Sequence, residues 1–435
     1  MRSGMLFAIA GALGLAGCAY PYPPPALAPV TVPAPALPAA PLEATQAAAP
    51  VTILVSIDGF RPDYLDRGVT PNLDRLKTAG ISAAMRPSFP SVTFPNHWTL
   101  VTGMRPDRSG IVGNRMEDAR RPGEVFTMQT DDPFWWSDAE PIWATAEKMG
   151  IRTATMFWPG ANVAIGGTRA TSGHHAVSGG TRPSDWQQYN EAVTGEQRVA
   201  TVIDWLRRPA ATRPRLITLY FDIVDTAGHD GGPADPRTTA AVAKVDAQIG
   251  ALVAGLAEIG QPANIVVVAD HGMAATSSSR TVALADLADP ADLRTIETGP
   301  VASIVPLPGR EDAVARRLLR PHDHVQCWRK AAMPARFHYG RNPRVAPFVC
   351  LAETGWLIVA TPPTAPFSGG AHGYDPADPA MAALFLASGP AFVGGKRLAS
   401  FDNVDVAPLL RDLIGLPPGR DLDGDDAPFR AVLKR

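Results

Sequence analysis

Short apolar runs recur along the chain from residue 51 onward and alternate with amphipathic segments. The apolar runs are rich in β-branched residues and cover residues 51–57, 153–157, 216–221, 265–269, 356–360 and 384–387. Continuous apolar runs of this length are typical of strands buried on both faces of a sheet. Between them, apolar residues return at helical spacing in residues 71–79, 196–206 and 238–259. This alternation predicts a three-layer α/β domain with a largely parallel central sheet.

Residues from about 305 to 350 depart from that alternation. They are rich in Arg, Pro and His, and their apolar positions show only weak periodicity. We interpret this segment as a smaller cap or insertion on the main domain, which we expect to span residues 51–435.

The N-terminal residues have the pattern of an export signal. Arg2 precedes an apolar run at residues 5–16, which is too short to span about 30 Å of hydrocarbon as a helix. We therefore expect residues 1–17 to be a signal peptide. The run ends in a motif that resembles the bacterial lipoprotein cleavage box, Leu15-Ala16-Gly17-Cys18. The resemblance implies that Cys18 is lipidated, and the alternative is a plain signal peptide followed by a chance cysteine.

The residues after Cys18 have the composition of a linker. Residues 19–50 contain ten prolines and a single charged residue, Glu43, so they cannot supply a hydrophobic core. We expect residues 18–50 to be an extended Pro/Ala-rich tether. An anchored tether predicts a lipoprotein of the bacterial cell envelope that faces the periplasm or the cell surface and is held to the membrane by its lipid.

The amino-acid composition excludes several classes of function. With 46% hydrophobic and 19% charged residues, the chain has enough apolar surface for a globular core. Its 40 basic and 42 acidic residues give a formal charge of −2, so we expect no binding of duplex nucleic acid through bulk charge. Three cysteines exclude a Cys-rich zinc ribbon. A metal site in this chain must therefore use histidine and carboxylate.

Three aspartates follow expected strands. Asp58 comes directly after residues 51–57, Asp225 closely follows residues 216–221, and Asp270 directly follows residues 265–269. A single Asp at a strand end is usually a helix cap or a turn former. Three of them are harder to explain in that way, because ligands of open α/β sheets bind beyond the carboxyl ends of the strands.

Three of the nine histidines lie beside small residues or these aspartates. His229, His271 and His372 each have a glycine as an immediate neighbour, where a backbone can approach a ligand closely. Mixed Asp and His ligation is typical of zinc, and the ligands suffice for two ions about 3.5 to 4 Å apart, the arrangement used for in-line phosphoryl displacement. We assign surface or structural roles to the remaining six, His97, His174, His175, His322, His324 and His338.

Eight short motifs carry a family resemblance. In chain order they are Ile57-Asp58-Gly59, Thr93-Phe94-Pro95-Asn96-His97, Gly110-Ile111-Val112-Gly113-Asn114, Glu140-Pro141-Ile142-Trp143, Phe157-Trp158-Pro159-Gly160, Asp225 to His229, Asp270-His271-Gly272-Met273 and Gly370 to Gly373. From about residue 51 to the C-terminus, the chain resembles the nucleotide pyrophosphatase/phosphodiesterase family of the alkaline phosphatase superfamily. The resemblance implies an alkaline-phosphatase-like fold.

The resemblance also implies the ligands of two Zn²⁺ ions. One ion would be held by Asp225, His229 and His372, and the other by Asp58, Asp270, His271 and the hydroxyl of Thr93. Thr93 would be the nucleophile, and Asn114 with the backbone around Thr93 would receive a non-bridging phosphate oxygen. Taken alone, the Thr93 hydroxyl could instead cap a helix that begins near residue 95.

The activity implied is that of an exported, zinc-dependent hydrolase of nucleotide phosphodiester and pyrophosphate bonds. It would release nucleoside monophosphates through a phospho-threonine intermediate. Because Asn114 is neutral, the site favours diester monoanions over monoester dianions. Phe94 and Trp186 could hold a base between them by stacking, although Trp186 could equally be a packing residue.

Two other functions remain open at this point. One is a phosphodiesterase with the same metals that acts on a lipid head group of the glycerophosphodiester or choline type. The other is a lipoprotein that retains the fold for binding without catalysis. Intact ligand residues and Asn114 argue against the second of these.

Export changes the interpretation of the two remaining cysteines. In an oxidising compartment two leftover thiols can pair. We therefore predict a disulfide between Cys327 and Cys350, and the alternative is two buried, unpaired cysteines.

Overall fold

The computed structural model of the chain describes residues 48–170 and 176–434. The expected signal peptide, Cys18 and most of the expected tether therefore lie outside the described residues, as do His174 and His175. Everything below concerns the unit that begins at residue 47.

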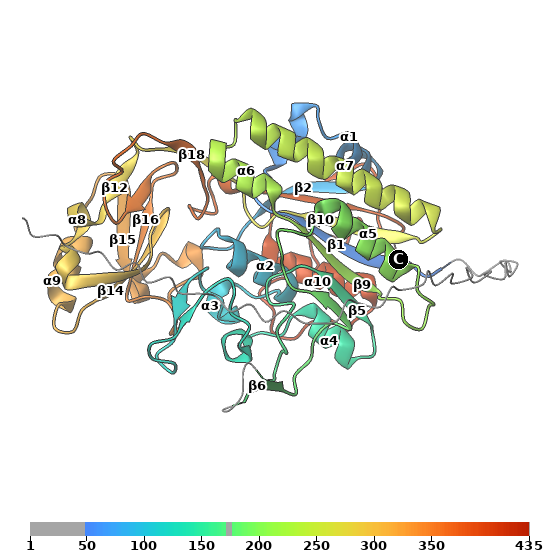
Figure 1. Ribbon diagram of the computed structural model, residues 1–435, viewed down its shortest axis with the longest axis horizontal. Helices are drawn as coiled ribbons and strands as arrows, with labels where there is room; N and C mark the ends of the chain where they lie inside the picture. The colour runs from blue at the N-terminus through green and yellow to red at the C-terminus, as the bar shows by residue number, and fades with distance from the viewer. Residues whose placement is uncertain (1–47, 171–175, 435) are drawn as a thin grey trace, which may run out of the picture. The chain divides into compact units, whose positions relative to one another are not determined.

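A nine-stranded sheet forms the centre of this unit (Figure 1). Its order is β20-β2-β19-β10-β1-β9-β5-β8, and β21 also pairs with β2. Strand bounds are β1 Val51–Ile57, β2 Ile81–Arg86, β5 Thr153–Met156, β8 Asp185–Gln187, β9 Leu216–Phe221, β10 Ala263–Val268, β19 Ala383–Ser388, β20 Lys396–Arg397 and β21 Phe401–Asp402. Strands β10, β1, β9, β5 and β8 are parallel, whereas β19 runs antiparallel to both β10 and β2. The largely parallel central sheet is confirmed.

Helices form two groups, one on each side of the sheet (Figure 1). The first group is α1 Pro71–Ala79, α5 Gly195–Leu206, α6 Ile223–Gly231 and α7 Pro236–Glu258, in which α7 contacts the other three. The second group is α2 Thr93–Thr102, α3 Pro106–Ser109, α4 Ile142–Lys148 and α10 Val406–Ile414, in which α2 contacts the other three. The predicted three-layer α/β architecture is therefore confirmed.

Within the described residues, α7 is the one helix long and apolar enough to cross a membrane. Its apolar stripe is buried in the protein at Val242, Val245, Ile249 and Leu252. Packing of the first helical layer therefore accounts for its hydropathy.

A second, antiparallel sheet lies outside the central one and is drawn in yellow and orange in Figure 1. Its order is β13-β14-β16-β15, with bounds β13 Leu293–Glu297, β14 Val301–Pro306, β15 Val325–Arg329 and β16 Phe348–Ala352. Helix α9, Glu311–Leu318, contacts β15, and the sheet has a hydrophobic cluster of its own. The sheet begins at Leu293, ahead of the insertion boundary that we expected near residue 305.

Cys327 on β15 lies opposite Cys350 on β16, and the structure joins them in a disulfide. The pairing is the one expected from the sequence. It ties the edge strand of the second sheet to its neighbour.

Short elements complete the chain. They are β3 Met116–Glu117, β4 Val125–Phe126, β6 Thr168–Arg169, β7 Val177–Ser178, β11 Ala274–Ser277, β12 Thr281–Ala283, α8 Leu284–Leu287, β17 Leu357–Val359 and β18 Ser368–Ala371, with 3₁₀ turns between some of them. One strand expectation is wrong in its placement. The run at 356–360 does not enter the central sheet, because β17 pairs with β12 in a separate two-stranded ladder.

Candidate metal and phosphate site

Adjacent parallel strands bring the aspartates together. β10, β1 and β9 are neighbours in register, so their carboxyl ends meet at one edge of the sheet. Asp58 directly follows β1, Asp270 follows β10 by two residues, and Asp225 lies in the first turn of α6 after β9. Gly59 has a φ of +68°, and a side chain there would come within 3.1 Å of Asp225. The glycine after Asp58 thus permits the close approach of α6.

One group of ligand atoms surrounds His271. Its Nε2 lies 2.9 Å from Asp270 Oδ2 and 3.5 Å from Asp58 Oδ1, and Thr93 Oγ1 lies 3.4 Å away. Ligands of a tetrahedral zinc ion with bonds near 2.05 Å are about 3.3 Å apart. These separations fit four ligands of one ion.

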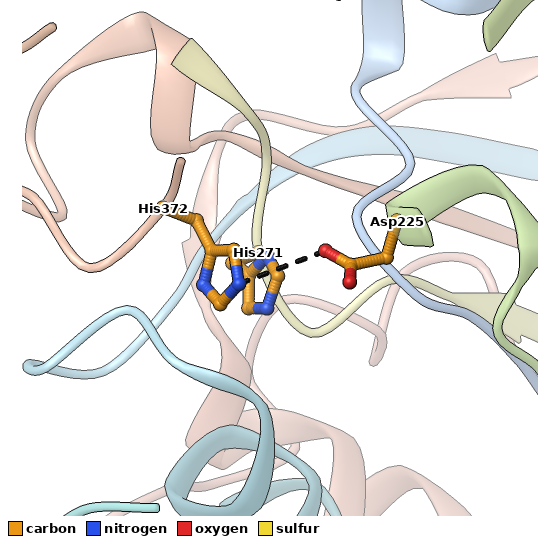
Figure 2. Close-up of side chains that lie close together, drawn as sticks. All are labelled: Asp225, His271 and His372. Carbon is orange, nitrogen blue, oxygen red and sulfur yellow. Dashed lines mark ion pairs between the residues drawn. The ribbon is translucent and has the colours of Figure 1, made fainter. Parts of the chain in front are cut away.

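A second group contains Asp225, His229 and His372. His229 Nε2 lies 3.4 Å from Asp225 Oδ2 and 3.0 Å from His372 Nε2, and His372 Nε2 lies 3.6 Å from Asp225 Oδ1. Figure 2 shows the carboxylate of Asp225 facing the imidazole of His372, with the His271 ring behind it. The His271 and His372 rings stack with centroids 3.5 Å apart. The two groups are therefore adjacent, as a two-metal site requires.

Three buried carboxylate oxygens in these groups have no hydrogen-bond partner. They are Asp58 Oδ1, Asp225 Oδ1 and Asp270 Oδ2. An unsatisfied buried carboxylate is costly, and a bound cation removes the cost. The donor set is thus suited to metal ions. One candidate group is Asp225, His271 and His372, the other is Asp58, Asp270 and His271, and His271 belongs to both.

Each of the three imidazoles is oriented by a backbone carbonyl. The Nδ1 of His229 donates to Gly370 O at 2.9 Å, that of His271 to Gly272 O at 2.9 Å, and that of His372 to Ser91 O at 3.0 Å. An Nδ1–H donor leaves the lone pair on Nε2. These contacts turn Nε2 of each histidine toward the other candidate ligand atoms.

Mutual repulsion shapes the electrostatics of the acids. Burial raises the pKa of Asp58 well above its usual value, and the charges of Asp270 and Asp225 raise it further. Burial also opposes ionisation of Asp270, but His271 and His97 hold its pKa well below the usual range. Burial, followed by the neighbouring histidines, lowers the pKa of His372, which keeps this imidazole neutral. The neighbouring Asp270 in turn raises the pKa of His271 against the effect of its burial. A bound cation would stabilise the ionised carboxylates.

Thr93 begins helix α2, two residues before the expected start. Val92 is the N-cap residue, and the Thr93 side chain makes no capping hydrogen bond. The capping interpretation of Thr93 is therefore wrong, and its hydroxyl points to His271 instead. A hydroxyl at a helix N-terminus lies where the backbone N–H groups and the helix dipole favour a phosphate.

Asn114 lies against this helix start. Its Oδ1 accepts a hydrogen bond of 2.9 Å from the backbone N–H of Phe94. With the oxygen engaged, the Nδ2 amide group is left to donate to a ligand beside Thr93. The structure thus brings Thr93, Asn114 and both metal-ligand groups into one site.

His97 and Tyr220 form hydrogen bonds to two of the candidate ligand residues, Thr93 and Asp58. His97 is fully buried, and its ring bonds to Ser56 Oγ at 2.8 Å and to Thr93 O at 2.9 Å. Its structural assignment agrees with this position. Tyr220 donates to Asp58 Oδ2 at 2.7 Å. The sequence did not single out Tyr220, because one tyrosine in a buried strand carries no motif.

Phe94 and Trp186 occupy different surroundings. Phe94 is partly buried against Phe126 and Trp136. Trp186 lies on the edge strand β8 with 38% of its surface exposed, and the guanidinium of Arg182 lies over its ring.

Tyr189, which follows β8, lies beside Tyr220, the tyrosine that donates to the candidate ligand Asp58. Its ring centroid lies 5.9 Å from that of Tyr220, and its hydroxyl donates to Asp222. The ring is 43% exposed. The sequence did not single out Tyr189. The only available signal was its position three residues after Trp186.

Comparison with known proteins places the chain in a family. Residues 52–375 match the family described as type I phosphodiesterase / nucleotide pyrophosphatase. The chain belongs to this family. It is 35% identical to the bis(5′-adenosyl)-triphosphatase enpp4 of Xenopus laevis over 86% of its own length and 79% of that protein. It is also 35% identical to ectonucleotide pyrophosphatase/phosphodiesterase family member 3 of Bos taurus, of which the match spans 42%.

Solved structures of the family agree. Human ectonucleotide pyrophosphatase/phosphodiesterase 5 superposes with a TM-score of 0.81 at 32% identity, over 88% of this chain and all of that one. The murine counterpart, as an inactive threonine-to-alanine variant in complex with AMP, gives a TM-score of 0.81 at 33% identity and the same coverage. The protein is thus a nucleotide pyrophosphatase/phosphodiesterase with an alkaline-phosphatase-like fold.

Proposed function

We propose that the protein is an exported hydrolase that uses two zinc ions to cleave nucleotide phosphodiester and pyrophosphate bonds through a phosphorylated Thr93. The observation that carries this proposal is the position of the Thr93 hydroxyl at the start of α2, beside His271, which belongs to both candidate metal-ligand groups. The AMP bound to the murine relative supports a nucleoside monophosphate product. The names of the relatives favour nucleotides over lipid head groups.

The distances support a set of ligands for each ion. Asp225, His229 and His372 would hold one ion, and Asp58, Asp270, His271 and Thr93 would hold the other. Bound zinc would lower the pKa of the Thr93 hydroxyl and neutralise phosphate charge. Three aspartates against two divalent ions leave a net charge of about +1, which attracts a diester monoanion.

Different side chains of the protein would take separate roles in the reaction. Thr93 Oγ1 attacks phosphorus, the bond to the leaving oxygen breaks, and water later hydrolyses the phospho-threonine. The Asn114 amide donates to a non-bridging oxygen, where charge accumulates in the transition state. Tyr220 and the carbonyls behind the histidines hold the ligands in place.

Thr93→Ala tests this mechanism. Asp58, Asp270 and His271 remain, so the variant should keep its zinc content, whereas kcat for a nitrophenyl nucleotide ester should fall by several orders of magnitude. Metal analysis and steady-state rates on the same sample separate the two effects. His372→Ala is the matched comparison, because it should lose zinc and activity together. Full turnover by Thr93→Ala would end the proposal.

We further propose that the enzyme is anchored to the bacterial cell envelope through lipidated Cys18. The support is the motif at residues 15–18, together with a disulfide that requires an oxidising compartment. Cys18→Ser should move the protein from the membrane fraction to the soluble fraction. Unchanged partitioning would contradict the anchor without affecting the catalytic proposal.

A further inference from the structure

Asn114 lies in a segment without regular secondary structure. It sits between α3, which ends at Ser109, and β3, which begins at Met116. We call residues 110–114 the phosphate-binding turn. The position of the Asn114 amide therefore depends on the contacts that fix this turn.

Residues 339–344, which connect β15 to β16 in the second sheet, supply those contacts. We call them the brace segment. Tyr339 Oη donates to the carbonyl of Val112 at 2.8 Å, two residues before Asn114. Arg344 Nη1 donates to the carbonyl of Gly110 at 2.8 Å. The first residue and the middle residue of the turn are thus held by side chains from the connection between β15 and β16.

A carboxylate just ahead of the turn reinforces the brace. Asp107, in α3, accepts the backbone N–H groups of three consecutive brace residues at 2.9 to 3.0 Å, namely those of Gly340, Arg341 and Asn342. Hydrogen bonds to a charged acceptor are the stronger kind, so this contact fixes the separation of the two segments.

Burial and hydrogen bonds fix the position of the Arg344 side chain. Its guanidinium is fully buried, and Nε donates to Asp118 Oδ2 at 2.9 Å. Its other donors reach the carbonyls of Trp135 and Phe134 at 2.7 and 3.2 Å. A buried guanidinium that leaves such partners would become an unpaired buried charge, so its position is fixed.

We propose that the brace segment positions the Asn114 amide for the phosphate, so that Tyr339 and Arg344 act as positioning residues of the catalytic site. The inference rests on the proposed role of Asn114. It gives the second sheet a function: the sheet holds the phosphate-binding turn from outside the central domain. Small displacements matter here, because a 1 Å misplacement of a reacting geometry can lower the rate about 100-fold.

Tyr339→Phe is the sharpest test. The change removes one hydroxyl and keeps the ring, whose centroid lies 5.2 Å from that of Phe89, so the fold should persist. We expect kcat/KM for a nitrophenyl nucleotide ester to fall about 3- to 10-fold, mainly through kcat. Tyr64→Phe is the matched control, because Tyr64 is buried against Arg67 in the 3₁₀ turn Pro62–Arg67, away from the phosphate-binding turn. It should leave kcat/KM unchanged.

A double-mutant cycle with Asn114→Ala isolates the pathway. If Tyr339 acts through Asn114, Tyr339→Phe should have no further effect in the Asn114→Ala background. The same fold-loss in both backgrounds, or no loss in the wild-type background, would overturn the inference. Asn114→Ala measured alone reports on the proposed function. An unchanged rate for that single variant would overturn the proposed role of Asn114 and the inference with it, whereas a slow Asn114→Ala beside a normal Tyr339→Phe would overturn the inference alone.

Asp107→Asn provides an independent second variant. It weakens the three backbone contacts to the brace segment and leaves Tyr339 intact. Its loss of kcat/KM should also disappear in the Asn114→Ala background. A loss that persists there would show that the brace acts on the fold in general, which contradicts the proposal.

Discussion

At the scale of single residues, the site depends on hydrogen bonds that engage one ring nitrogen of each histidine and the amide oxygen of Asn114. Backbone carbonyls engage Nδ1 of the three ligand histidines, and Phe94 engages the oxygen of Asn114. The atoms left over are Nε2 of each histidine, which faces the proposed metal positions, and the Asn114 amide N–H₂, which we propose binds phosphate. The side chains are therefore oriented before any ligand arrives, which avoids reorganisation during the reaction.

Base recognition distinguishes two aromatic residues. The ring contact with Tyr220 favours Tyr189 as the base-stacking side chain, whereas Trp186 lies on the edge strand beneath Arg182. Tyr189→Ala should lower kcat/KM for nucleotides by a factor that corresponds to about 1 to 3 kcal/mol of lost stacking. It should lower kcat/KM for bis-nitrophenyl phosphate much less. Trp186→Ala, measured in parallel, should have the smaller effect on nucleotides. A larger loss of kcat/KM in Trp186→Ala than in Tyr189→Ala would favour our sequence-based prediction that Trp186 stacks on the base.

The residues that could be predicted from sequence are those with a local signature. Asp58, Asp225 and Asp270 follow recognisable strands, and the histidines have glycine neighbours. Tyr220 and Tyr189 have neither signal. Their part in the site comes from strand order, which places β9 between β1 and β5 and which no local pattern encodes.

At the scale of elements, the strands that could be predicted from sequence are those buried on both faces of the sheet. β1 and β9 have the predicted bounds because each is a continuous apolar run. β2 was missed, since its sequence ISAAMR is rich in alanine and has little strand preference. The run at 356–360 was assigned to the wrong sheet, because a short apolar strand pairs equally well in a small ladder.

The disulfide should contribute measurably to the second sheet. Cys327 and Cys350 are separated by 23 residues, for which chain entropy predicts about 3 kcal/mol of stabilisation. The double variant Cys327→Ala/Cys350→Ala should lower the free energy of unfolding by about that amount, measured by urea denaturation. Reducing the wild-type protein should produce the same shift, and reduction of the double variant should produce none. An unchanged urea midpoint in the double variant would show that the bond carries no stability.

At the scale of the whole molecule, we expect metal binding and folding to be coupled. Burial, and then repulsion from neighbouring carboxylates, opposes ionisation of Asp58 and Asp225, and bound cations would remove this cost. The two sheets meet at this site through the phosphate-binding turn. A loss of metal should therefore affect stability as well as activity.

Chelation should destabilise the protein, more at pH 8 than at pH 5.5. The folded-state pKa values of Asp58 and Asp225 are raised, chiefly by burial, so their cost appears as the pH rises through the unfolded-state value and is complete above the folded-state one. Asp270 opposes this trend, because its neighbouring histidines keep it ionised. Thermal unfolding with and without EDTA at both pH values measures the effect, and added Zn²⁺ should reverse it. A melting temperature that is indifferent to EDTA would contradict the coupling.

The proposed metal ligands are spread along the chain from Asp58 to His372, in a protein of 435 residues. More than four fifths of the sequence must therefore be present before both ligand sets are complete. A chain truncated before residue 372 would lack His372 and also strand β19, which pairs with β10 and β2 in the central sheet. Proteases that cleave unfolded chains should therefore remove such a product.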